Sequence, residues 1–268
     1  MDLSIVIPAY NEAHKIENDV QAAARFLRDN NLTGEIIIAD DGSSDGTAAA
    51  AREASGGHGV DVRIVELPHR GKGSAVREGI IASRGECVMF ADSGLCVPFE
   101  DALPALRLLR EGKFDIANGS RKLPDSVIAR PQSWYRRLLS RMFRFAVRLY
   151  MGLPRGLSDT QCGFKIYRGD VAREIYGGCA TDGFMFDLEV LLKALAKRYR
   201  VMEFPVHWTC DRDSRLKPSR ILLRTFSELR DVKHQVAEDL AAAEAILKGA
   251  EETAGANHGL AGARSERH

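Results

Sequence analysis

Strand-like apolar segments alternate with helical patterns over the first 120 residues, and this alternation restricts the fold more than any other feature of the sequence. Continuous apolar runs predict strands at about 3–7, 35–39, 60–66, 87–91 and 115–118. Helical patterns fill the intervals, at about 12–30, from 45 onward, 73–83 and 99–110. Apolar strands separated by helices are typical of a parallel sheet that is covered on both faces. The sequence therefore predicts an α/β fold.

The second half of the chain is less regular. Helices are predicted at 133–151, 186–198 and 217–248, and a strand is predicted at 201–208. Residues 249–268 are rich in Gly, Ala and charge, which predicts a disordered tail. A chain of 268 residues suffices for one large α/β domain, and we expect residues 1–248 to form it.

Charge, cysteine content and hydropathy restrict the function. The formal net charge is +1, from 38 basic and 37 acidic residues, so a surface made for nucleic acid is not expected. The five cysteines form no CxxC pair, and their odd number favours a reducing compartment. The chain starts without a basic, then apolar, leader, and no window holds 18 uncharged apolar residues. Any membrane role is therefore expected from a surface patch.

Polar clusters follow three of the predicted strands, at 8–12, 40–45 and 92–94. The carboxyl ends of parallel strands meet at one edge of a sheet, where such folds bind ligands. Asp40 and Asp41 can accept hydrogen bonds from a base or ribose, or help hold a metal near phosphates. A turn and helix cap is sufficient to explain residues 45–47, but the repulsion between Asp40 and Asp41 predicts a ligand or cation that offsets it. Taken alone, Asp92 is better explained as a turn acid than as a metal ligand.

A basic segment, HRGKGSAVREG at 69–79, precedes a predicted helix. It lacks the spacing of a phosphate-binding P-loop. Cations beside a helix N-terminus favour an anion, and a solvated basic turn is the equal alternative.

Residues 121–148 carry eight basic side chains and one acid. Arg137, Arg141, Arg144 and Arg148 share one face of the predicted helix 133–151, with bulky apolar residues beside them. This pattern suits an anionic membrane surface or an amphiphilic phosphate, and an ordinary amphipathic helix is the alternative.

The remaining polar residues give weaker signals. Cys162 is expected to be a small buried residue, and the histidines show no metal-ligand spacing. Asp187 and Glu189 are expected to be caps or surface charges on a helix that buries its apolar face.

In this order, several segments resemble glycosyltransferase family 2, above all its dolichyl- and polyprenyl-phosphate sugar synthases. The segments are SIVIPAYNEAHKI (4–16), IIIADDGSSDGT (36–47), GKGSAVREGI (71–80), VMFADSG (88–94), NGSR (118–121), DTQCGFKIYRGD (159–170), DGFMFDLEVLL (182–192) and FPVHW (204–208). The resemblance implies the type A glycosyltransferase fold, a Rossmann-like, mostly parallel sheet flanked by helices. It also implies a nucleotide-sugar-binding half at 1–120 and an acceptor-binding half at 121–248.

The resemblance also implies roles for individual residues. The residues that match nucleotide-sugar-binding positions are Pro8, Ala9, Tyr10, Asn11, Glu12, Asp40, Asp41, Lys72, Asp92 and Ser93. Asp92 matches a ligand of Mg²⁺ or Mn²⁺. The residues that match acceptor-phosphate positions are Arg121, Arg136, Ser140, Arg212 and Lys217. Of these, Asp92, Lys72 and Arg121 are the implied catalytic residues.

The sequence departs from the family pattern in two motifs. Asp92-Ser93-Gly94 stands where the family has Asp-Ala-Asp, so the second metal carboxylate is missing. Mg²⁺ can bind few protein ligands together with diphosphate oxygens, so binding is expected to survive but weaken. The basic motif RDSRLKP at 212–218 lacks the usual Gly and Ser before its lysine. Many members carry C-terminal membrane helices and this sequence shows none, so helix 133–151 is expected to meet the lipid.

The implied activity is inverting transfer of a hexose from a nucleotide sugar to dolichyl or polyprenyl phosphate at the cytoplasmic membrane surface. UDP-glucose is favoured over GDP-mannose as the donor. The acceptor phosphate is already ionised, so no strong general base is required. One alternative is a saccharide hydroxyl acceptor, with Asp187 as the nearest candidate base. Another is a nucleotide-sugar-binding protein without catalysis. Assembly of identical chains is left open.

Overall fold

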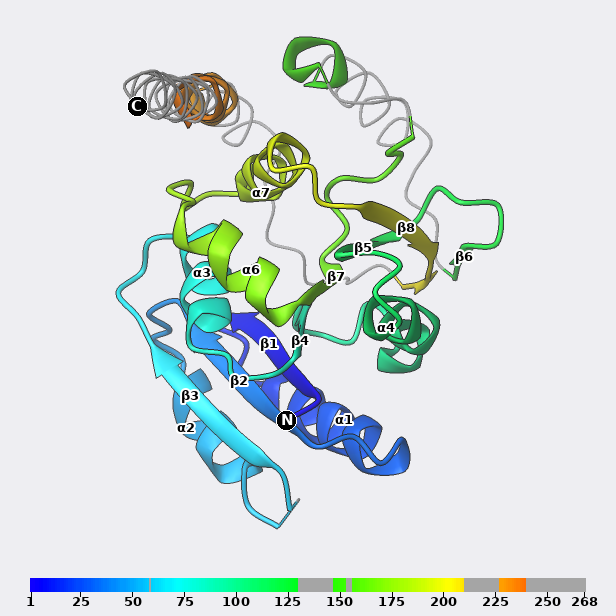
Figure 1. Cartoon of the computed structure of the whole chain (residues 1–268). Helices are drawn as coiled ribbons and strands as arrows, with labels where there is room; N and C mark the ends of the chain where they lie inside the picture. Colours follow the sequence, from blue (N-terminus) through cyan, green and yellow to red (C-terminus); the bar gives the residue numbers. More distant parts are fainter. Residues whose placement is uncertain (58, 130–146, 153–155, 210–226, 240–268) are drawn as a thin grey trace, which may run out of the picture.

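The computed structural model describes residues 1–57, 59–129, 147–152, 156–209 and 227–239. Within these residues, seven strands form one sheet in the order β3-β2-β1-β4-β7-β5-β8, and β6 pairs with β9 (Figure 1). The neighbouring pairs β1–β2, β2–β3, β1–β4 and β5–β8 are parallel, whereas β7 runs antiparallel to β4 and β5. The predicted mostly parallel α/β sheet is confirmed.

The first half follows the predicted alternation closely. Its elements are β1 (Leu3–Ala9), α1 (Ile16–Asp29), β2 (Gly34–Asp40), α2 (Thr47–Ala54), β3 (Asp61–Glu66), α3 (Lys72–Ile81), β4 (Cys87–Ala91), the 3₁₀ helix η1 (Phe99–Ala102), α4 (Leu103–Arg110) and β5 (Ile116–Ser120). All residues of β1 and β4 are buried, as expected for inner strands with helices on both faces.

The second half contains elements that the sequence did not predict. Its elements are β6 (Val127–Ile128), β7 (Phe164–Arg168), α6 (Gly169–Gly177), α7 (Phe186–Ala196), β8 (Val201–Pro205) and β9 (His207–Trp208). Strand β7 was missed because FKIYR alternates apolar and basic residues rather than forming an apolar run. The strand predicted at 201–208 is two strands, because β9 leaves the large sheet to pair with β6.

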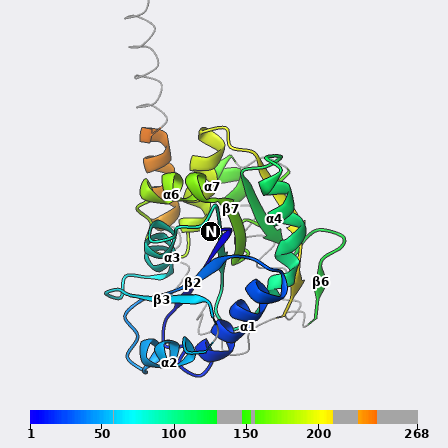
Figure 2. The ribbon, with the colours of Figure 1, turned by 60° about the horizontal axis from the view of Figure 1, so that its bottom comes forward.

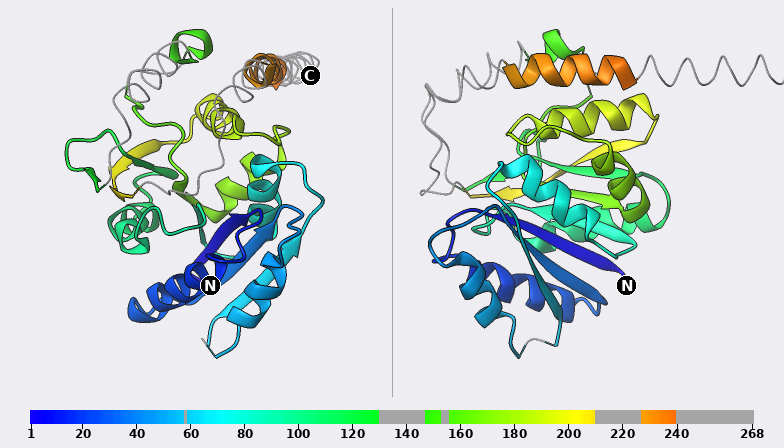
Figure 3. Two further views of the ribbon diagram at one scale, coloured as in Figure 1. Left: turned by 180° about the vertical axis from the view of Figure 1, so that it is seen from behind. Right: turned by 90° about the vertical axis from the view of Figure 1, so that its left-hand side faces the viewer.

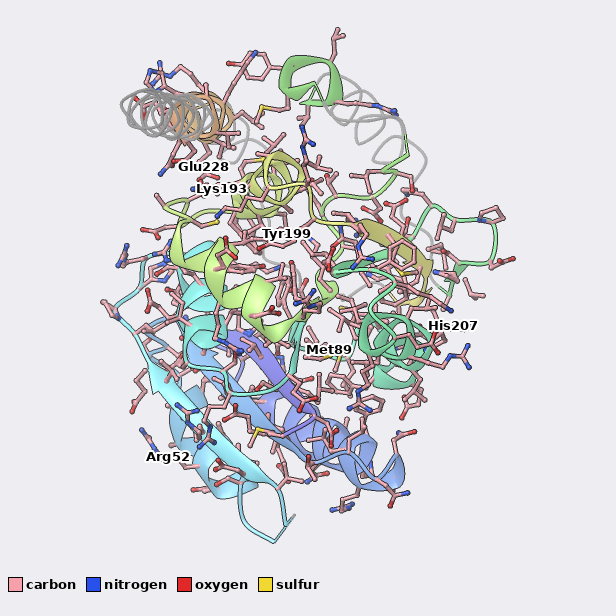
Figure 4. The ribbon with its side chains drawn as sticks, in the orientation of Figure 1. Arg52, Met89, Lys193, Tyr199, His207 and Glu228 are labelled. Carbon is pink, nitrogen blue, oxygen red and sulfur yellow. The ribbon has the colours of Figure 1, made fainter. Side chains whose placement is uncertain are left out.

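Alternate residues of the strands face two different layers. Leu3, Ile5 and Ile7 of β1 pack with α1, while Val6 faces the other layer, where α3, α6 and α7 lie. Figures 1 and 2 show α1 and α2 on one side of the sheet and α3 and α6 on the other. Met89, in the middle of β4, is fully buried between these layers (Figure 4). Helices on both faces leave the strand ends as the place for polar chemistry.

A further layer covers α7 on its side away from the sheet (Figure 3, right). Val147 and Met151 from one segment and Leu229 and Val232 from another pack with Leu188 of α7. Residues 147–151 and 227–239 are helical, which agrees with parts of two predicted helices. Lys193 of α7 lies 2.9 Å from Asp239, and Glu228 accepts a hydrogen bond from the backbone N–H of Met185 (Figure 4).

Several predictions lie outside the described residues. They are most of helix 133–151, the ends of helix 217–248, the tail at 249–268, and the acceptor-side residues Arg136, Ser140, Arg212 and Lys217. Among the residues that the structure does describe, no helix combines the length and the apolar character needed to cross a bilayer.

Candidate functional site

The loops after β1 and β2 are joined at the carboxyl edge of the sheet. The backbone N–H of Asn11 donates to Ser43 Oγ at 2.8 Å, and Asn11 Oδ1 accepts from the N–H of Ser44 at 2.8 Å. The N–H of Glu12 donates to Thr47 Oγ1 at 2.9 Å. The structure therefore brings together the two predicted nucleotide-side clusters, residues 8–12 and 40–47. Pro8 and Ala9 end the buried strand β1 beneath them.

Asp40 and Asp41 are both buried, yet each has donors within the protein. Ser43 donates to Asp40 Oδ1 from its backbone and its hydroxyl. Asp41 accepts from the N–H groups of Arg70 and Gly71 at 2.9 and 3.1 Å and pairs with His69 Nδ1 at 2.8 Å. These donors stabilise both carboxylates within the protein, and the ligand or cation expected from their repulsion stays a prediction. Their assignment to nucleotide binding stays a prediction.

Tyr10 and His69 form an aromatic pair above Asp41. Their ring centroids are 4.1 Å apart, and the planes differ by 14°. Tyr10 is 41% exposed, so one aromatic surface at this edge remains open to a flat ligand. Sequence reasoning treated His69 as part of a basic turn and missed this pairing, because the two residues are far apart in the chain.

The glycine-rich segment before α3 packs against the loop that precedes α7. Gly73 and Ser74 donate their N–H groups to the carbonyl oxygen of Asp182, at 2.8 and 3.3 Å. A side chain at Gly73 would collide with the carbonyl oxygen of Thr181. The N-terminus of α3 is thus capped by a protein carbonyl. The interpretation of these N–H groups as an anion cradle is wrong.

The basic turn itself is not simply solvated. The carboxylate of Asp182 lies 3.0 Å from Arg70 and 2.7 Å from Arg77, and Arg77 is buried. These pairs hold the segment 69–77 against the second half of the chain. Lys72, another basic side chain of this segment, instead contacts Asp92 at the carboxyl edge.

Lys72 and Asp92 form the central ion pair of the site. Lys72 Nζ lies 2.6 Å from Asp92 Oδ1. Burial of the ammonium lowers the pKa of Lys72, but Asp92 and Asp187 outweigh it, and the net pKa is raised. Lys72 is therefore charged at neutral pH. Arg121 Nη2 donates to the carbonyl oxygen of Gln161 at 3.4 Å, and the Asp92 N–H donates to that of Gly163, so Arg121 and Asp92 contact the same short segment.

Asp92 follows β4 and rests on the chain of β7. Its N–H donates to the carbonyl oxygen of Gly163 at 2.8 Å, and any side chain at residue 163 would overlap the Asp92 carboxylate. The glycine in DTQCGFK is thus required for this carboxylate to reach its position. Neighbouring Cys162 is buried, which raises the pKa of its thiol to about 12. The prediction of a small buried cysteine is confirmed.

A second ion pair, Lys165 with Asp187, lies beneath the first. The side chains are 3% and 6% exposed, and Lys165 Nζ also donates to the carbonyl oxygen of Thr160 at 2.9 Å. Burial raises the pKa of Asp187, although Lys165 and Lys72 oppose it. The expectation that Asp187 is a cap or surface charge is wrong. Sequence reasoning missed Lys165 because β7 itself was missed.

Glu189 is likewise buried rather than on the surface. Its carboxylate accepts from the N–H groups of Ala180 and Thr181, at 3.0 and 2.8 Å. It thereby holds the loop that caps α3. The expectation of a cap or surface charge is wrong here too, because Glu189 orders a loop rather than its own helix.

Arg121 follows β5 and is held by Asp159. Its Nε and Nη2 donate to the two carboxylate oxygens at 2.7 and 2.8 Å. Burial raises the pKa of Asp159, but Arg121 outweighs it and holds the pKa below its usual value. The Trp208 ring lies 5.5 Å from the Arg121 guanidinium carbon. Arg121 is thus oriented from two sides, which suits recognition of a phosphate.

The described residues contain no group of three His, Cys, Asp or Glu side chains that could hold a metal ion by themselves. The Asp92 side chain is 34% exposed, and its Oδ1 contacts Lys72 Nζ. One such carboxylate fits a hard divalent cation that takes its other ligands from diphosphate oxygens and water. The site therefore fits a cation that arrives bound to the phosphates of the donor, rather than a cation whose ligands all come from the protein.

A mostly parallel sheet with acids, an ion-paired lysine and a held arginine at its carboxyl edge defines the class of type A glycosyltransferases. The family model of glycosyl transferase family 2 matches residues 4–176. The chain belongs to this family.

Two curated relatives and one solved structure illustrate the likeness. Dolichyl-phosphate beta-glucosyltransferase of Drosophila melanogaster is 34% identical over 230 residues, covering 81% of this chain and 70% of the relative. The human protein of the same name is 33% identical over 228 residues, with the same coverage. Glucosyl-3-phosphoglycerate synthase of Mycobacterium tuberculosis, crystallised with Mn²⁺, UDP-glucose and phosphoglyceric acid, superposes with a TM-score of 0.60 at 20% identity. That match covers 90% of this chain and 80% of the synthase, and it supports the fold.

Proposed function

We propose that this chain transfers glucose from UDP-glucose to dolichyl or polyprenyl phosphate, with inversion at the sugar carbon. The observation that carries the proposal is the Lys72–Asp92 ion pair at the carboxyl edge of a family 2 sheet, with Asp92 and Arg121 both bonded to the segment 161–163. Two cationic side chains there suit two phosphate groups, one leaving and one attacking. The names of the relatives in flies and humans support glucose and dolichyl phosphate as the substrates.

The proposed reaction is a single in-line displacement. An oxygen of the acceptor phosphate bonds to the anomeric carbon of glucose as the bond from that carbon to the UDP oxygen breaks. The acceptor oxygen carries no proton at neutral pH, so catalysis rests on position and charge. Lys72, kept charged by its acidic neighbours, stabilises the departing diphosphate. Arg121, oriented by Asp159, holds the acceptor phosphate.

The proposal includes a divalent cation that Asp92 would bind. Mg²⁺ or Mn²⁺ bound there would neutralise charge on the donor diphosphate. Tyr10 and the residues around Asp40 and Asp41 would receive the nucleoside, and Ser93 adjoins the diphosphate side. These assignments depend on the position of each residue at the carboxyl edge.

The alternative with a saccharide hydroxyl acceptor requires a carboxylate base. Asp187 is 6% exposed and ion-paired with a buried lysine, which leaves it poorly placed to take a proton from an acceptor. The phosphate acceptor is therefore the better proposal, because it needs no base.

We also propose that the protein acts at the cytoplasmic face of a membrane, to which it binds peripherally. Leu149 and Tyr150 of the layer over α7 are 76% and 45% exposed, and Phe184 in the loop before α7 is 42% exposed. Lys233 Nζ lies 4.2 Å from the centroid of the Tyr150 ring. Apolar side chains beside a lysine suit an anionic lipid surface. The free cysteines among the described residues agree with a reducing compartment.

The test is transfer of radiolabel from UDP-glucose and GDP-mannose, in parallel, to a short polyprenyl phosphate in detergent with Mg²⁺ or Mn²⁺. We expect label in the organic phase from UDP-glucose. Transfer from GDP-mannose alone would contradict the donor. Metal-dependent binding of UDP without transfer would instead indicate a binding protein without catalysis or a different acceptor, which a parallel assay with soluble saccharides would detect.

A further inference from the structure

The turn that follows Asp92 has an unusual backbone. Gly94 has a φ of +92°, and Leu95, which is not a glycine, has a φ of +50°. Left-handed backbone at a leucine is unfavourable and persists only where neighbouring groups enforce it. Leu95 is 37% exposed, so contacts made by the rest of the turn also bear on this backbone conformation.

One carboxylate, Asp19 of α1, holds this turn. Asp19 Oδ2 accepts from the Ser93 hydroxyl at 2.7 Å, and Asp19 Oδ1 accepts from the N–H of Gly94 at 2.9 Å. Asp19 is 1% exposed and lies 74 residues before Ser93 in the chain. Two donors from one turn thus converge on a single buried side chain.

Asp19 has no ion-pair partner among the described residues that would explain its burial. Burial and the nearby Glu12 both disfavour the negative charge on Asp19. The pKa of Asp19 is therefore raised to about 6. A buried carboxylate that costs stability at neutral pH and binds only a turn beside Asp92 points to a role in the site.

We propose that Asp19 is a positioning residue, which fixes the 93–95 turn so that Asp92 presents its carboxylate to the cation. This inference rests on the proposed function, in which Asp92 binds a divalent cation with the donor diphosphate. Gly163 limits Asp92 from one side and Lys72 from another. Asp19 fixes the backbone directly after Asp92, through Ser93 and Gly94. It thereby orders the Asp92-Ser93-Gly94 motif, which has one acid where the family usually has two.

The test compares Asp19→Asn with Glu17→Gln, which removes an exposed acid from the same helix. Mn²⁺ affinity in the presence of UDP is measured by the electron paramagnetic resonance signal of free Mn²⁺, and unfolding is followed by heating at pH 7.5. For D19N we expect Mn²⁺ to bind on the order of 10-fold more weakly, because the amide keeps one acceptor oxygen and replaces the other by an NH₂ group that cannot accept from the turn. We expect no loss of thermal stability, because the buried charge is removed. E17Q should match the wild type in both measurements.

A rescue variant separates positioning from general structure. The substitution Leu95→Gly relieves the backbone strain that Asp19 offsets, because glycine adopts a positive φ without a steric penalty. The double variant D19N/L95G should therefore recover most of the lost Mn²⁺ affinity. Unchanged affinity in D19N would overturn the inference. So would a weakened affinity that L95G leaves unimproved.

Two further variants make the outcome decisive. If D19N fails to fold, Ser93→Ala removes one donor and leaves the carboxylate, and we expect a loss of about 3-fold in Mn²⁺ affinity. Unchanged affinity in S93A would then reject the role of Asp19. Asp92→Asn tests the proposed function separately. If D92N binds Mn²⁺ as the wild type does, the proposed metal site fails, whatever Asp19 does.

Discussion

Glu35 at the amino ends of the central sheet and Asp19 at its carboxyl ends are both buried carboxylates, but their pKa values are shifted in opposite directions. At the amino ends, Glu35 accepts hydrogen bonds from Ser4, Arg63 and Arg84 at 2.7–2.9 Å. Burial opposes its ionisation, but these donors outweigh burial and lower the pKa of Glu35 to about 2. At the carboxyl ends, burial outweighs the donors at Asp19 and Asp187 and raises their pKa values, whereas Arg121 keeps the pKa of Asp159 low.

This difference separates a stabilising network from a functional one. A carboxylate with a lowered pKa contributes stability at neutral pH, whereas a buried carboxylate with a raised pKa reduces it. The carboxyl end therefore carries a cost in stability, which is common where side chains are held ready for a ligand. Substitutions at the two ends should change different properties of the protein.

The largest expected effect is that of Asp92→Asn at the carboxyl end. The variant loses the charge that pairs with Lys72 and would hold the cation, so transfer should fall on the order of 10²–10³-fold. Its melting temperature should stay close to that of the wild type. Asp170→Asn at the amino end, which removes a 64% exposed acid, is the control and should keep full activity. Transfer by D92N within a few-fold of the wild type would contradict the contrast between the two ends.

Glu35→Gln should show the reverse pattern. It removes a buried charge between two arginines, and urea unfolding should give a loss of about 3 kcal/mol. Transfer per folded molecule should be unchanged. Asp61→Asn removes the exposed acid that shares Arg84, and it should cost less than about 1 kcal/mol. A loss of activity in folded E35Q would show that the amino end also serves the site.

The elements that could be predicted from the sequence are those with a local signal. Strands β1, β2 and β4 are continuous apolar runs, and each polar cluster that follows them lies at the carboxyl edge as expected. Strand β7 was missed because Lys165 interrupts its apolar pattern, and that lysine turns inward to pair with Asp187. Glu35 did not hide β2 because it lies before three isoleucines, whereas Lys165 lies within the short strand β7 and leaves no apolar run.

The partners within the site could not be predicted, because they depend on tertiary contacts. Asp41 pairs with His69, Arg121 with Asp159, and Asp182 with Arg70, across 28, 38 and 112 residues. Local patterns suggested turns and caps for such acids, which is their usual role. The family resemblance indicated Asp92, Lys72 and Arg121, but it gave no signal for Asp19, which lies on a helix remote in sequence from the turn it holds.

A smaller effect is expected from Asp159→Asn. Asp159 and Asp115 are buried aspartates that pair with arginines at the carboxyl and amino ends of β5, respectively. Arg121 would lose its charged partner, and the KM for polyprenyl phosphate should rise about 10-fold, which corresponds to about 1.4 kcal/mol, while the KM for UDP-glucose stays constant. Asp115→Asn is the matched control, because Asp115 holds Arg168 and Arg200 at the amino end of β5. D115N should lower stability without changing either KM. Equal effects of D159N and D115N on the acceptor KM would remove the special role of Arg121.

The smallest effect is on the pH dependence of stability, where the two ends should act with opposite signs. Glu35 has a folded-state pKa of about 2 against 4.5, so its contribution is present above pH 4.5 and is lost as the pH falls toward 2. Asp19 has a folded-state pKa of about 6 against 3.8, so its contribution is greatest below pH 3.8 and is lost as the pH rises through 6. Each group exchanges less than one proton, so each slope is below about 1.4 kcal/mol per pH unit.

Urea unfolding between pH 3 and 7 measures both slopes. E35Q should flatten the loss of stability below pH 4.5, and D19N should flatten the decline between pH 4 and 6. E35Q should leave the decline between pH 4 and 6 unchanged, and D19N should leave the loss below pH 4.5 unchanged. The two groups lie at opposite ends of the sheet and share no hydrogen-bond partner. If D19N instead steepened the decline between pH 4 and 6, the carboxylate would be a stabilising charge. The two ends of the sheet would then differ in position but not in their physical chemistry.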